Sequence, residues 1–506
     1  MTVRQLVSAL TEALPPEQPP VITPAHAALD QECRGIAYDS RRVQLGSIFV
    51  ALRGAKVDGT AFAAQAISAG AAAIVAETEA PATGGSVPWI TVADARLALA
   101  LLAAEYAGHP SHRLSVVGIT GTNGKTTTAY LTSAILEAAG MHNGMMGTVT
   151  YRIGDRAFAA TRTTPEAPDV QGFMRQMVDA GAVACVMEVS SHALALRRVD
   201  GIRFAAAVFT NLTRDHLDFH GDMENYFAAK RRLFEMLPPD APALINADDP
   251  RAASLIETAG RPVTYAVNRP ADVSAGRVDY SMEGLAFDVA TPQGAVHVRS
   301  KLVGKPNVYN ILAAVGTAAA LGVPLAAIES GLADLQGVPG RFQLASLATD
   351  DVTVVVDYAH TDDALRNLLE TARPLASRRL ITVFGAGGDR DRTKRPLMGM
   401  VAARMSDVVV ITSDNPRSED PQRIIDEVKR GADPEVQQRR IEVRGITDRK
   451  EALHDAIGRA QPGDVVLIAG KGHEQYQEIA GRVYPFDDVA VAREALEARR
   501  MKSRVG

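Results

Sequence analysis

The segment LSVVGITGTNGKTTT, residues 114–128, decides how this chain is expected to fold. Its first part, 114–119, is an apolar run typical of a buried strand, and residues 129–139 after it favour a helix. A glycine loop between a buried strand and a helix turns backbone amides toward an anion at the helix N-terminus. The segment therefore predicts a nucleotide phosphate loop, with Lys125 on the β- and γ-phosphates and the Thr126 hydroxyl on Mg²⁺.

This loop departs from the common nucleotide-triphosphate pattern at one position. The pattern places a glycine five residues before Gly124, whereas this chain has Ile119 there and Gly118 one residue earlier. The helix after the loop has its expected C-terminal cap at Gly140. A glycine turn capped by threonine, without any phosphate, is the alternative. Gly-Lys-Thr between a strand and a helix is more specific than a glycine loop, so we favour the phosphate loop.

Short apolar strands alternate with helical stretches on both sides of the loop, which is typical of α/β domains. The expected strands are 47–51, 72–76 and 89–92, then 114–119, 184–188, 206–210 and 243–246, then 352–357, 381–384, 408–412 and 465–469. A helix over 95–108 leads from the first group to the second. At 506 residues the chain is too long for one core. We predict three α/β domains: N-terminal (1–97), central with a parallel sheet of the phosphate-loop ATPase type (98–340), and C-terminal and Rossmann-like (341–506).

The composition excludes several classes of protein. The chain has 54 basic and 59 acidic residues and a net charge of -5, so it lacks the basic excess of a nucleic-acid binder. Its two cysteines, Cys33 and Cys185, lie far apart in sequence, which fits a reducing compartment and no disulfide framework. No apolar run reaches membrane-spanning length, and the N-terminus has no signal core. We expect a cytoplasmic enzyme with small-molecule substrates.

The phosphate loop resembles the ATP loop of the Mur ligases, a family of peptidoglycan precursor enzymes. The resemblance extends in order through DSR at 39–41, TTP at 163–165, EVSSH at 188–192, TNL at 210–212, DHLD at 215–218, Lys230, DYAH at 357–360, GGDR at 387–390, DNPR at 414–417 and GKGHE at 470–474. These motifs are most similar to those of the members that add meso-diaminopimelate to UDP-N-acetylmuramoyl-L-alanyl-D-glutamate. The resemblance implies that ATP converts a carboxylate into an acyl phosphate, which the amine then attacks.

The resemblance also implies a catalytic centre with ATP and two Mg²⁺ ions. Its catalytic residues are Lys125, Glu188, His216 and Lys230, with Thr126, Glu188 and His216 as metal ligands and Lys230 carbamylated to N6-carboxylysine. The implied ATP-binding residues are Gly121, Thr122, Asn123, Gly124, Lys125, Thr126, Thr127, Asn307, Arg341, Asp357 and His360. Taken alone, Glu188 would be a solvated strand end, His216 a structural histidine and Lys230 an exposed helix residue.

Two further groups of residues are implied for the other substrates. The UDP-substrate residues are Tyr38, Ser40, Ala55, Lys56 and Val57 in the first domain and Thr163, Thr164, Ser190 and Arg198 in the central domain. The diaminopimelate residues are Arg390, Asp414, Asn415, Pro416, Arg417, Gly470 and Glu474. A bidentate arginine suits the carboxylate at the non-reacting end of diaminopimelate, and a glutamate suits its ammonium. The chain departs from the family at Leu196, where a glutamine is usual.

Three alternatives remain at this point. The first is the same fold with L-lysine as the amino acid, which Arg417 disfavours because lysine has no second carboxylate. The second is a ligase similar to folylpolyglutamate synthase, which shares the ATP loop but lacks the N-terminal UDP domain. The third is a nucleotide-dependent switch without ligation. For the diaminopimelate-adding enzyme we expect a monomer.

Overall fold

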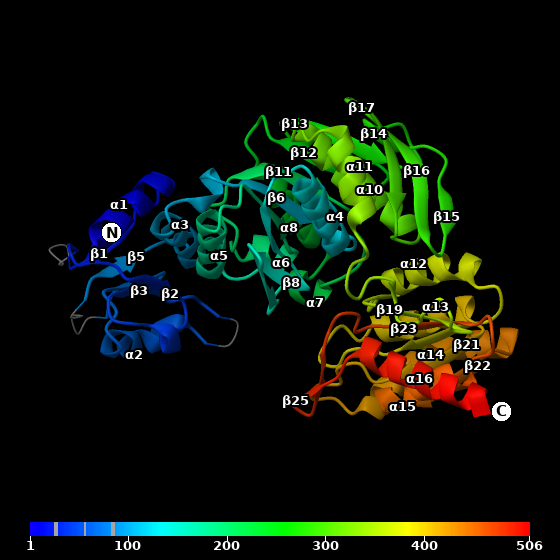
Figure 1. Cartoon of the computed structure of the whole chain (residues 1–506). Helices are drawn as coiled ribbons and strands as arrows, with labels where there is room; N and C mark the ends of the chain where they lie inside the picture. The colour runs from blue at the N-terminus through cyan, green and yellow to red at the C-terminus, as the bar shows by residue number, and fades with distance from the viewer. Residues whose placement is uncertain (25–28, 55–56, 82–86, 506) are drawn as a thin grey trace.

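The apolar runs of the sequence form three α/β bodies in the computed structural model, which describes residues 1–24, 29–54, 57–81 and 87–505. Figure 1 shows the N-terminal body in blue and the C-terminal body in yellow to red on either side of the central one. Each body has its own sheet, and most of the strand pairs are parallel. The predicted α/β class is confirmed. In the described part of the chain, no helix is long and apolar enough to span a membrane.

The N-terminal body is a small sheet with helices packed against it. Its strands lie in the order β1-β5-β4-β3-β2, and β1 alone runs antiparallel to its neighbour among the described residues. The elements are α1 (Val3–Ala13), β1 (Val21–Thr23), β2 (Gly35–Ala37), β3 (Ser47–Val50), α2 (Ala63–Ser68), β4 (Ala73–Ala76), β5 (Trp89–Thr91) and α3 (Ala95–Tyr106).

The central body contains the phosphate loop, between β6 (Ser115–Thr120) and α4 (Lys125–Ala138). The elements after α4 are β7 (Asn143–Met146), β8 (Thr150–Ile153), β9 (Arg156–Ala159), α5 (Ala167–Asp179), β10 (Ala184–Glu188), α6 (Ser191–Ala195), β11 (Phe204–Phe209), α7 (Leu217–His220), α8 (Met223–Glu235), β12 (Pro242–Asn246), α9 (Ala252–Thr258), β13 (Arg261–Ala266), β14 (Val273–Ala275), β15 (Asp279–Ser281), β16 (Gly284–Thr291), β17 (Gly294–Ser300), α10 (Lys305–Ala320) and α11 (Leu325–Asp334). Antiparallel strands extend the parallel sheet at both edges.

The order of the parallel strands places the phosphate loop at the point where the chain changes direction across the sheet. After β6 the chain passes to β7 and β10 on one side and then to β11 and β12 on the other. Parallel α/β sheets bind ligands at such a switch point, beyond the carboxyl ends of their strands. Ile119 is buried in β6, so the strand continues through Thr120 and the loop begins only at Gly121. This explains the departure from the usual glycine pattern.

The C-terminal body has the strand order β18-β19-β23-β20-β21-β22, in which only β18 is antiparallel among the described strands. A separate hairpin, β24-β25, lies beside it. The elements are β18 (Gln343–Leu344), β19 (Thr353–Asp357), α12 (Asp362–Ala372), β20 (Leu380–Phe384), α13 (Lys394–Met405), β21 (Val408–Thr412), α14 (Pro421–Arg439), β22 (Glu442–Ile446), α15 (Arg449–Arg459), β23 (Val465–Ala469), β24 (Tyr476–Ile479), β25 (Arg482–Pro485) and α16 (Asp488–Val505).

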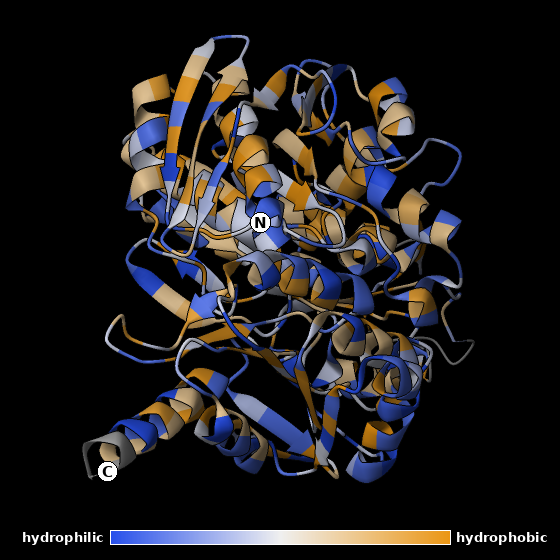
Figure 2. Ribbon diagram, turned by 90° about the vertical axis from the view of Figure 1, so that its right-hand side faces the viewer, coloured by the Kyte–Doolittle hydropathy of each residue, from blue (hydrophilic) through white to orange (hydrophobic). Residues whose placement is uncertain are grey.

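Each sheet buries apolar side chains on both faces. In β6, for example, Val117 and Ile119 belong to one core cluster and Val116 to another, on the opposite face. Figure 2 shows apolar residues in the helices as well as in the strands. This is the usual pattern of parallel sheets, whose strands are covered by helices on both sides. The polar residues that follow the strands therefore gather at the carboxyl edge of each sheet, where the candidate site lies.

Candidate active site

The phosphate loop has a backbone conformation that only glycine fits at two positions. Gly121 has φ 141°, and a Cβ there would lie 1.8 Å from Thr210 Oγ1. Gly124 has φ 89°, and its Cβ would lie 2.3 Å from Asn310 Oδ1. Lys125 folds back over the loop, where its Nζ donates to the carbonyl oxygens of Gly121 (2.9 Å) and Thr122 (2.8 Å). Burial removes the Lys125 ammonium from water and so lowers its pKa, and an anion bound beside it would stabilise the charged form.

Glu188 ends β10 beside this loop, and its carboxylate is buried rather than solvated. It accepts hydrogen bonds from Thr126 Oγ1 (3.1 Å), the Thr148 amide (2.7 Å) and Thr148 Oγ1 (2.9 Å). A Cβ on Gly147 would lie 2.4 Å from Glu188 Oε1, so glycine at 147 leaves space for the carboxylate. Gly147 and Thr148 are absent from the residues predicted from sequence. Their position just after β7, at the carboxyl edge of the sheet, is the signal that points to them.

Lys230 and His216 lie on the other side of the loop. Lys230 is 2% exposed, and its Nζ donates to the Gly121 carbonyl oxygen at 2.7 Å. Sequence context favours an exposed lysine on α8, and this expectation is wrong. Burial and the neighbouring ammonium of Lys125 hold the pKa of Lys230 well below its usual value. The side chain of His216 is 45% exposed, but desolvation lowers its pKa to about 4, so its imidazole is neutral near pH 7. The centre of its ring lies 4.8 Å from that of His192.

A cavity of about 740 Å³ opens between the central and C-terminal bodies, a volume suited to a nucleotide. Eight of the predicted ATP residues line it: Asn123, Gly124, Thr126, Thr127, Asn307, Arg341, Asp357 and His360. Gly121, Thr122 and Lys125 lie in the same loop but do not line this cavity. The aromatic side chains of Tyr265, Tyr280, Tyr309 and Phe342 also contribute to the lining. None of these four is among the site residues predicted from the sequence.

Residues after the central domain complete the cavity. Arg341 Nη2 donates to Thr126 Oγ1 at 3.1 Å, and the guanidinium lies 4.7 Å from the Tyr358 ring centre. Asn123 Nδ2 donates to Asp363 Oδ2 at 3.0 Å, which connects the phosphate loop to α12. Figure 1 shows α12 on the side of the C-terminal body that faces the central one. The two bodies are therefore close enough in this structure for Arg341 to lie beside the phosphate loop.

Asp357 and His360 mark the C-terminal wall of the cavity. The Asp357 carboxylate accepts hydrogen bonds from the amides of Phe342 (2.7 Å) and Ala359 (2.8 Å), and burial raises its pKa. The His360 Nδ1 lies 2.9 Å from the Tyr358 carbonyl oxygen. Asp357 therefore holds the start of the C-terminal domain in place while it faces the cavity.

The predicted UDP-substrate residues fall into two groups. In the central body, Thr163, Thr164, Ser190 and Arg198 lie beside Glu188: Thr164 Oγ1 donates to the Glu188 carbonyl oxygen (2.9 Å), and Arg198 Nη1 donates to the Thr164 carbonyl oxygen (3.1 Å). In the N-terminal body, Tyr38 donates to Asp169 Oδ2 of the central body at 2.7 Å, and Ser40 donates to Gln65. Val57 is exposed, and Ala55 and Lys56 lie outside the described residues.

The predicted amino-acid residues gather at the carboxyl edge of the third sheet. Arg417 has φ 53°, and backbone hydrogen bonds to Glu478 and Ala480 hold it against the β24-β25 hairpin. Its Nη1 donates to the Gly388 carbonyl oxygen at 2.6 Å, and its Nε lies 3.3 Å from Glu478 Oε2. Pro416 precedes it in the same loop. Arg390 instead lies on an exposed loop, where it bonds only the Asp389 carbonyl oxygen among the described residues.

Asp414, Asn415, Gly470 and Glu474 form the floor of this group. Asn415 Nδ2 donates to Glu474 Oε2 at 3.0 Å. Gly470 has φ 116°, and a Cβ there would lie 2.6 Å from Asp414 Oδ2. Burial raises the pKa of Glu474. The structure therefore brings an arginine and a partly buried glutamate to one edge of the sheet, with charges that suit the carboxylate and the ammonium of an amino acid.

Arg449 supports the carboxyl edge of the third sheet, although it lies outside the sequence motifs. Arg449 and Asp488 form a fully buried pair, with Arg449 Nη2 2.7 Å from Asp488 Oδ2. The same guanidinium donates to the carbonyl oxygens of Ser413 (3.1 Å) and Ala469 (3.0 Å). These two residues immediately precede Asp414 and Gly470, so Arg449 fixes the ends of β21 and β23 relative to each other.

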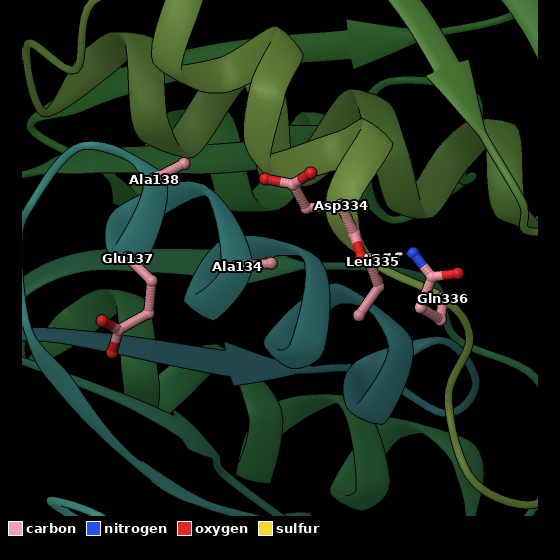
Figure 3. A pocket seen from close by; sticks show the side chains of 6 residues that line it. All are labelled: Ala134, Glu137, Ala138, Asp334, Leu335 and Gln336. Atoms are coloured by element: carbon pink, nitrogen blue, oxygen red, sulfur yellow. Dashed lines mark hydrogen bonds between the residues drawn. The ribbon is translucent and has the colours of Figure 1, made fainter.

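A second, shallower hollow of about 400 Å³ lies between α4 and α11, lined by Ala134, Glu137, Ala138, Asp334, Leu335 and Gln336 (Figure 3). It is at the end of α4 remote from the phosphate loop. The distance from Lys125 to Ala138 along the helix is roughly 20 Å at 1.5 Å per residue. Glu137 is already engaged with Asn143. The hollow shares no residue with the candidate active site.

Comparison with known proteins agrees with this geometry. The sequence matches the catalytic domain of the Mur ligase family over residues 32–107, the Mur ligase middle domain over 119–318 and the Mur ligase glutamate ligase domain over 340–472. The chain belongs to the Mur ligase family, as its motifs predict.

Three relatives with high sequence identity carry the same name. A UDP-N-acetylmuramoyl-L-alanyl-D-glutamate--2,6-diaminopimelate ligase of Syntrophomonas wolfei is 48% identical over 474 residues, which cover 93% of this chain and 96% of the relative. A protein of the same name from Solibacter usitatus is 49% identical over 471 residues, with 92% and 94% covered. A solved structure of a ligase of that name has a TM-score of 0.67 and 37% identity, and the match covers 94% of this chain and 97% of the other.

Proposed function

We propose that this chain is an ATP-dependent ligase that joins meso-diaminopimelate to the γ-carboxylate of D-glutamate in UDP-N-acetylmuramoyl-L-alanyl-D-glutamate, a step of peptidoglycan synthesis. The observation that carries the proposal is the placement of Arg417 and Glu474 at one sheet edge, with opposite charges for the two groups of an amino-acid end. The names of the relatives support the same substrates. A folylpolyglutamate synthase shares the fold at 18% identity, but it covers only 78% of this chain.

The reaction requires two bond changes. A carboxylate oxygen attacks the γ-phosphorus of ATP, the bond to ADP breaks, and an acyl phosphate forms; the amine then attacks the acyl carbon, loses a proton and releases phosphate. Lys125 and the loop amides bind the β- and γ-phosphates, where charge is redistributed during the first step. Thr164, Ser190 and Arg198 orient the muramoyl-dipeptide beside Glu188, and Arg341 approaches the phosphates from the linker. The central and C-terminal bodies already meet beside the phosphate loop, through Arg341 and Asp363.

Mg²⁺ is proposed to bind at Thr126 and Glu188, with a second ion beside His216. The residues fit: Glu188 is a buried carboxylate in a space that Gly147 leaves open, and the neutral imidazole of His216 has a lone pair to offer. Among the described residues, no three His, Cys, Asp or Glu side chains are grouped to hold a metal alone. This fits Mg²⁺, which usually binds through one or two carboxylates together with substrate phosphates. When bound, it supplies positive charge between two anionic reactants.

Lys230 is proposed to carry a carbamate. Carbamylation requires a neutral amine, and the low pKa of Lys230 provides one at lower pH than an ordinary lysine does. Two ammonium groups, on Lys125 and Lys230, donate to the same carbonyl oxygen of Gly121. Conversion of one of them to an anion replaces their repulsion with attraction. The carbamate would then orient the metal and its ligands.

Lys230→Ala is expected to lower the ligation rate by about 10- to 100-fold, the usual cost of removing a group that orients a metal site. Short carboxylates added to the assay should restore part of the rate, because they can occupy the position of the carbamate. When the protein is incubated with isotope-labelled bicarbonate, the chain with Lys230 should show a carbamate signal, and the Lys230→Ala variant should show none. A variant with normal turnover would show that Lys230 has only a structural role.

The remaining proposals concern the whole molecule. We propose domain limits of 1–97, 98–340 and 341–506, with the first domain on the uridine diphosphate through Tyr38, Ser40, Ala55, Lys56 and Val57. We further propose a cytoplasmic monomer. Its two cysteines are free thiols, as in a reducing compartment.

A panel of amino acids tests the proposed function directly. The protein is incubated with ATP, Mg²⁺ and UDP-N-acetylmuramoyl-L-alanyl-D-glutamate, and phosphate release is measured with each amino acid. We expect release only when both the muramoyl substrate and meso-diaminopimelate are present, together with a product of the summed mass less water. Preference for L-lysine would show that the ligase uses L-lysine in place of diaminopimelate. Phosphate release independent of both substrates would favour a nucleotide switch.

A further inference from the structure

Lys471 is a buried charged residue at the carboxyl edge of the third sheet, beside the predicted amino-acid residues. The sequence motifs imply no role for it. It follows Gly470 at the end of β23, and its side chain is fully buried. Its Nζ donates to Asn415 Oδ1 (3.0 Å) and Glu474 Oε2 (3.1 Å) and lies 4.0 Å from Asp414 Oδ1. A buried ammonium requires such partners to offset its loss of hydration. Lys471 therefore links the loop after β21 to the loop after β23.

The contacts of Lys471 fix the orientation of Glu474. Asn415 Nδ2 and Lys471 Nζ both donate to Glu474 Oε2. No described residue donates to the second oxygen, Oε1. A carboxylate with one oxygen held by two donors can rotate little, so Oε1 has one direction in which to accept the ammonium of an amino acid. Without Lys471, only the neutral amide of Asn415 would hold this side chain.

Lys471 also changes the charge of the pocket. Asp414 and Glu474 are both carboxylates near the same ammonium, and the charge of Asp414 helps to raise the pKa of Glu474. On the opposite side, Arg417 is already partly paired with Glu478. Among these five groups the three carboxylates exceed the two cations by one, and removal of the charge of Lys471 would raise the excess to two. A pocket with the larger excess would attract a lone ammonium more strongly. With Lys471 present, the excess is smaller, which suits a group that carries both a carboxylate and an ammonium.

We propose that Lys471 is a specificity-determining, positioning residue, whose buried ammonium offsets the Asp414 and Glu474 carboxylates so that the pocket favours an amino-acid end with both carboxylate and ammonium over a lone ammonium. The inference rests on the proposed function of this pocket. It predicts that the choice between diaminopimelate and L-lysine depends on a residue that need not touch either ligand.

The test compares Lys471→Met and Lys471→Gln with Lys471→Arg, which keeps the charge. Phosphate release is measured with diaminopimelate and with L-lysine at saturating ATP and muramoyl substrate. In the Met and Gln variants we expect kcat/KM for diaminopimelate to fall, and the ratio of lysine to diaminopimelate kcat/KM to rise by about tenfold or more. Arg should preserve most of the original ratio. The KM for ATP should change little in all three.

The control is Lys450→Met, the same chemical change on a half-exposed lysine of α15 that pairs with Glu494. It should leave both rates unchanged. An equal fall for both amino acids in the Met and Gln variants would overturn the inference, because it would mean that Lys471 only holds the loops together. Protection by ADP in thermal unfolding verifies that each variant is folded; Gln keeps a donor to Glu474 if Met proves unstable. An unmodified protein that does not use diaminopimelate would instead reject the proposed function.

Discussion

Lys125→Ala is expected to abolish measurable ligation, with phosphate transfer reduced by about 10²- to 10³-fold or more, the cost of losing one preorganised group that stabilises transition-state charge. The fold should survive. In this structure the Lys125 ammonium bonds two loop carbonyl oxygens, and one of them, on Gly121, keeps its bond from Lys230. The substitution should therefore weaken the stabilisation of the phosphates rather than the stability of the fold. The measurement is phosphate release at saturating ATP, muramoyl substrate and diaminopimelate.

Two comparisons make this experiment decisive. Lys125→Arg keeps the charge but not the compact geometry of an ammonium, so it should recover only part of the rate. Lys301→Ala removes a lysine at an exposed position of the same domain, where it bonds Gln336, and should be silent. Turnover close to normal in Lys125→Ala would refute the assignment of the loop between β6 and α4 as a phosphate loop.

The local parts of the site are predictable from sequence because they depend on neighbouring residues. A strand, a glycine loop and a helix follow one another in the phosphate loop, so its geometry is encoded within one short segment. The polar ends of the strands are predictable for a related reason: parallel strands present their carboxyl ends at one edge, whatever the order of the strands. Glu188, Asp357 and Asp414 therefore lie where their strands end.

The contacts between distant segments are not predictable in the same way. Glu188 is held by Thr148, which lies 40 residues away in sequence, and Arg449 reaches Asp488 and Ser413 from a separate helix. Nothing local distinguishes Lys230 from an exposed lysine, because its burial results from packing of α8 under the phosphate loop. Continuous apolar runs also fail to identify β16, where buried Leu285, Phe287 and Val289 alternate with more exposed residues. The alternating pattern is the signal for such a strand.

Arg417→Ala is expected to weaken the use of diaminopimelate by about 2 to 5 kcal/mol, the range for truncating one member of a buried charge pair. This corresponds to roughly 30- to 4,000-fold in kcat/KM. The lower end is favoured because the Arg417 side chain is 21% exposed, and water screens part of its charge. Alanine adds no new backbone strain at φ 53°, because both residues carry a Cβ. The effect should therefore report the lost guanidinium.

The selectivity of this effect distinguishes a ligand contact from general damage. The KM values for ATP and the muramoyl substrate should change much less than that for diaminopimelate, because those residues lie mainly in the other two domains. Arg417→Lys should recover part of the loss, since an ammonium keeps the charge but not the two-pronged geometry. L-lysine should not become a good substrate of Arg417→Ala, because Lys471 still offsets Asp414 and Glu474, and Arg390 remains available for a carboxylate. Steady-state phosphate release, measured over a range of diaminopimelate and L-lysine concentrations, gives kcat and KM for both variants. If diaminopimelate kinetics are unchanged in Arg417→Ala, or if the unmodified protein uses L-lysine efficiently, Arg417 does not select the amino acid.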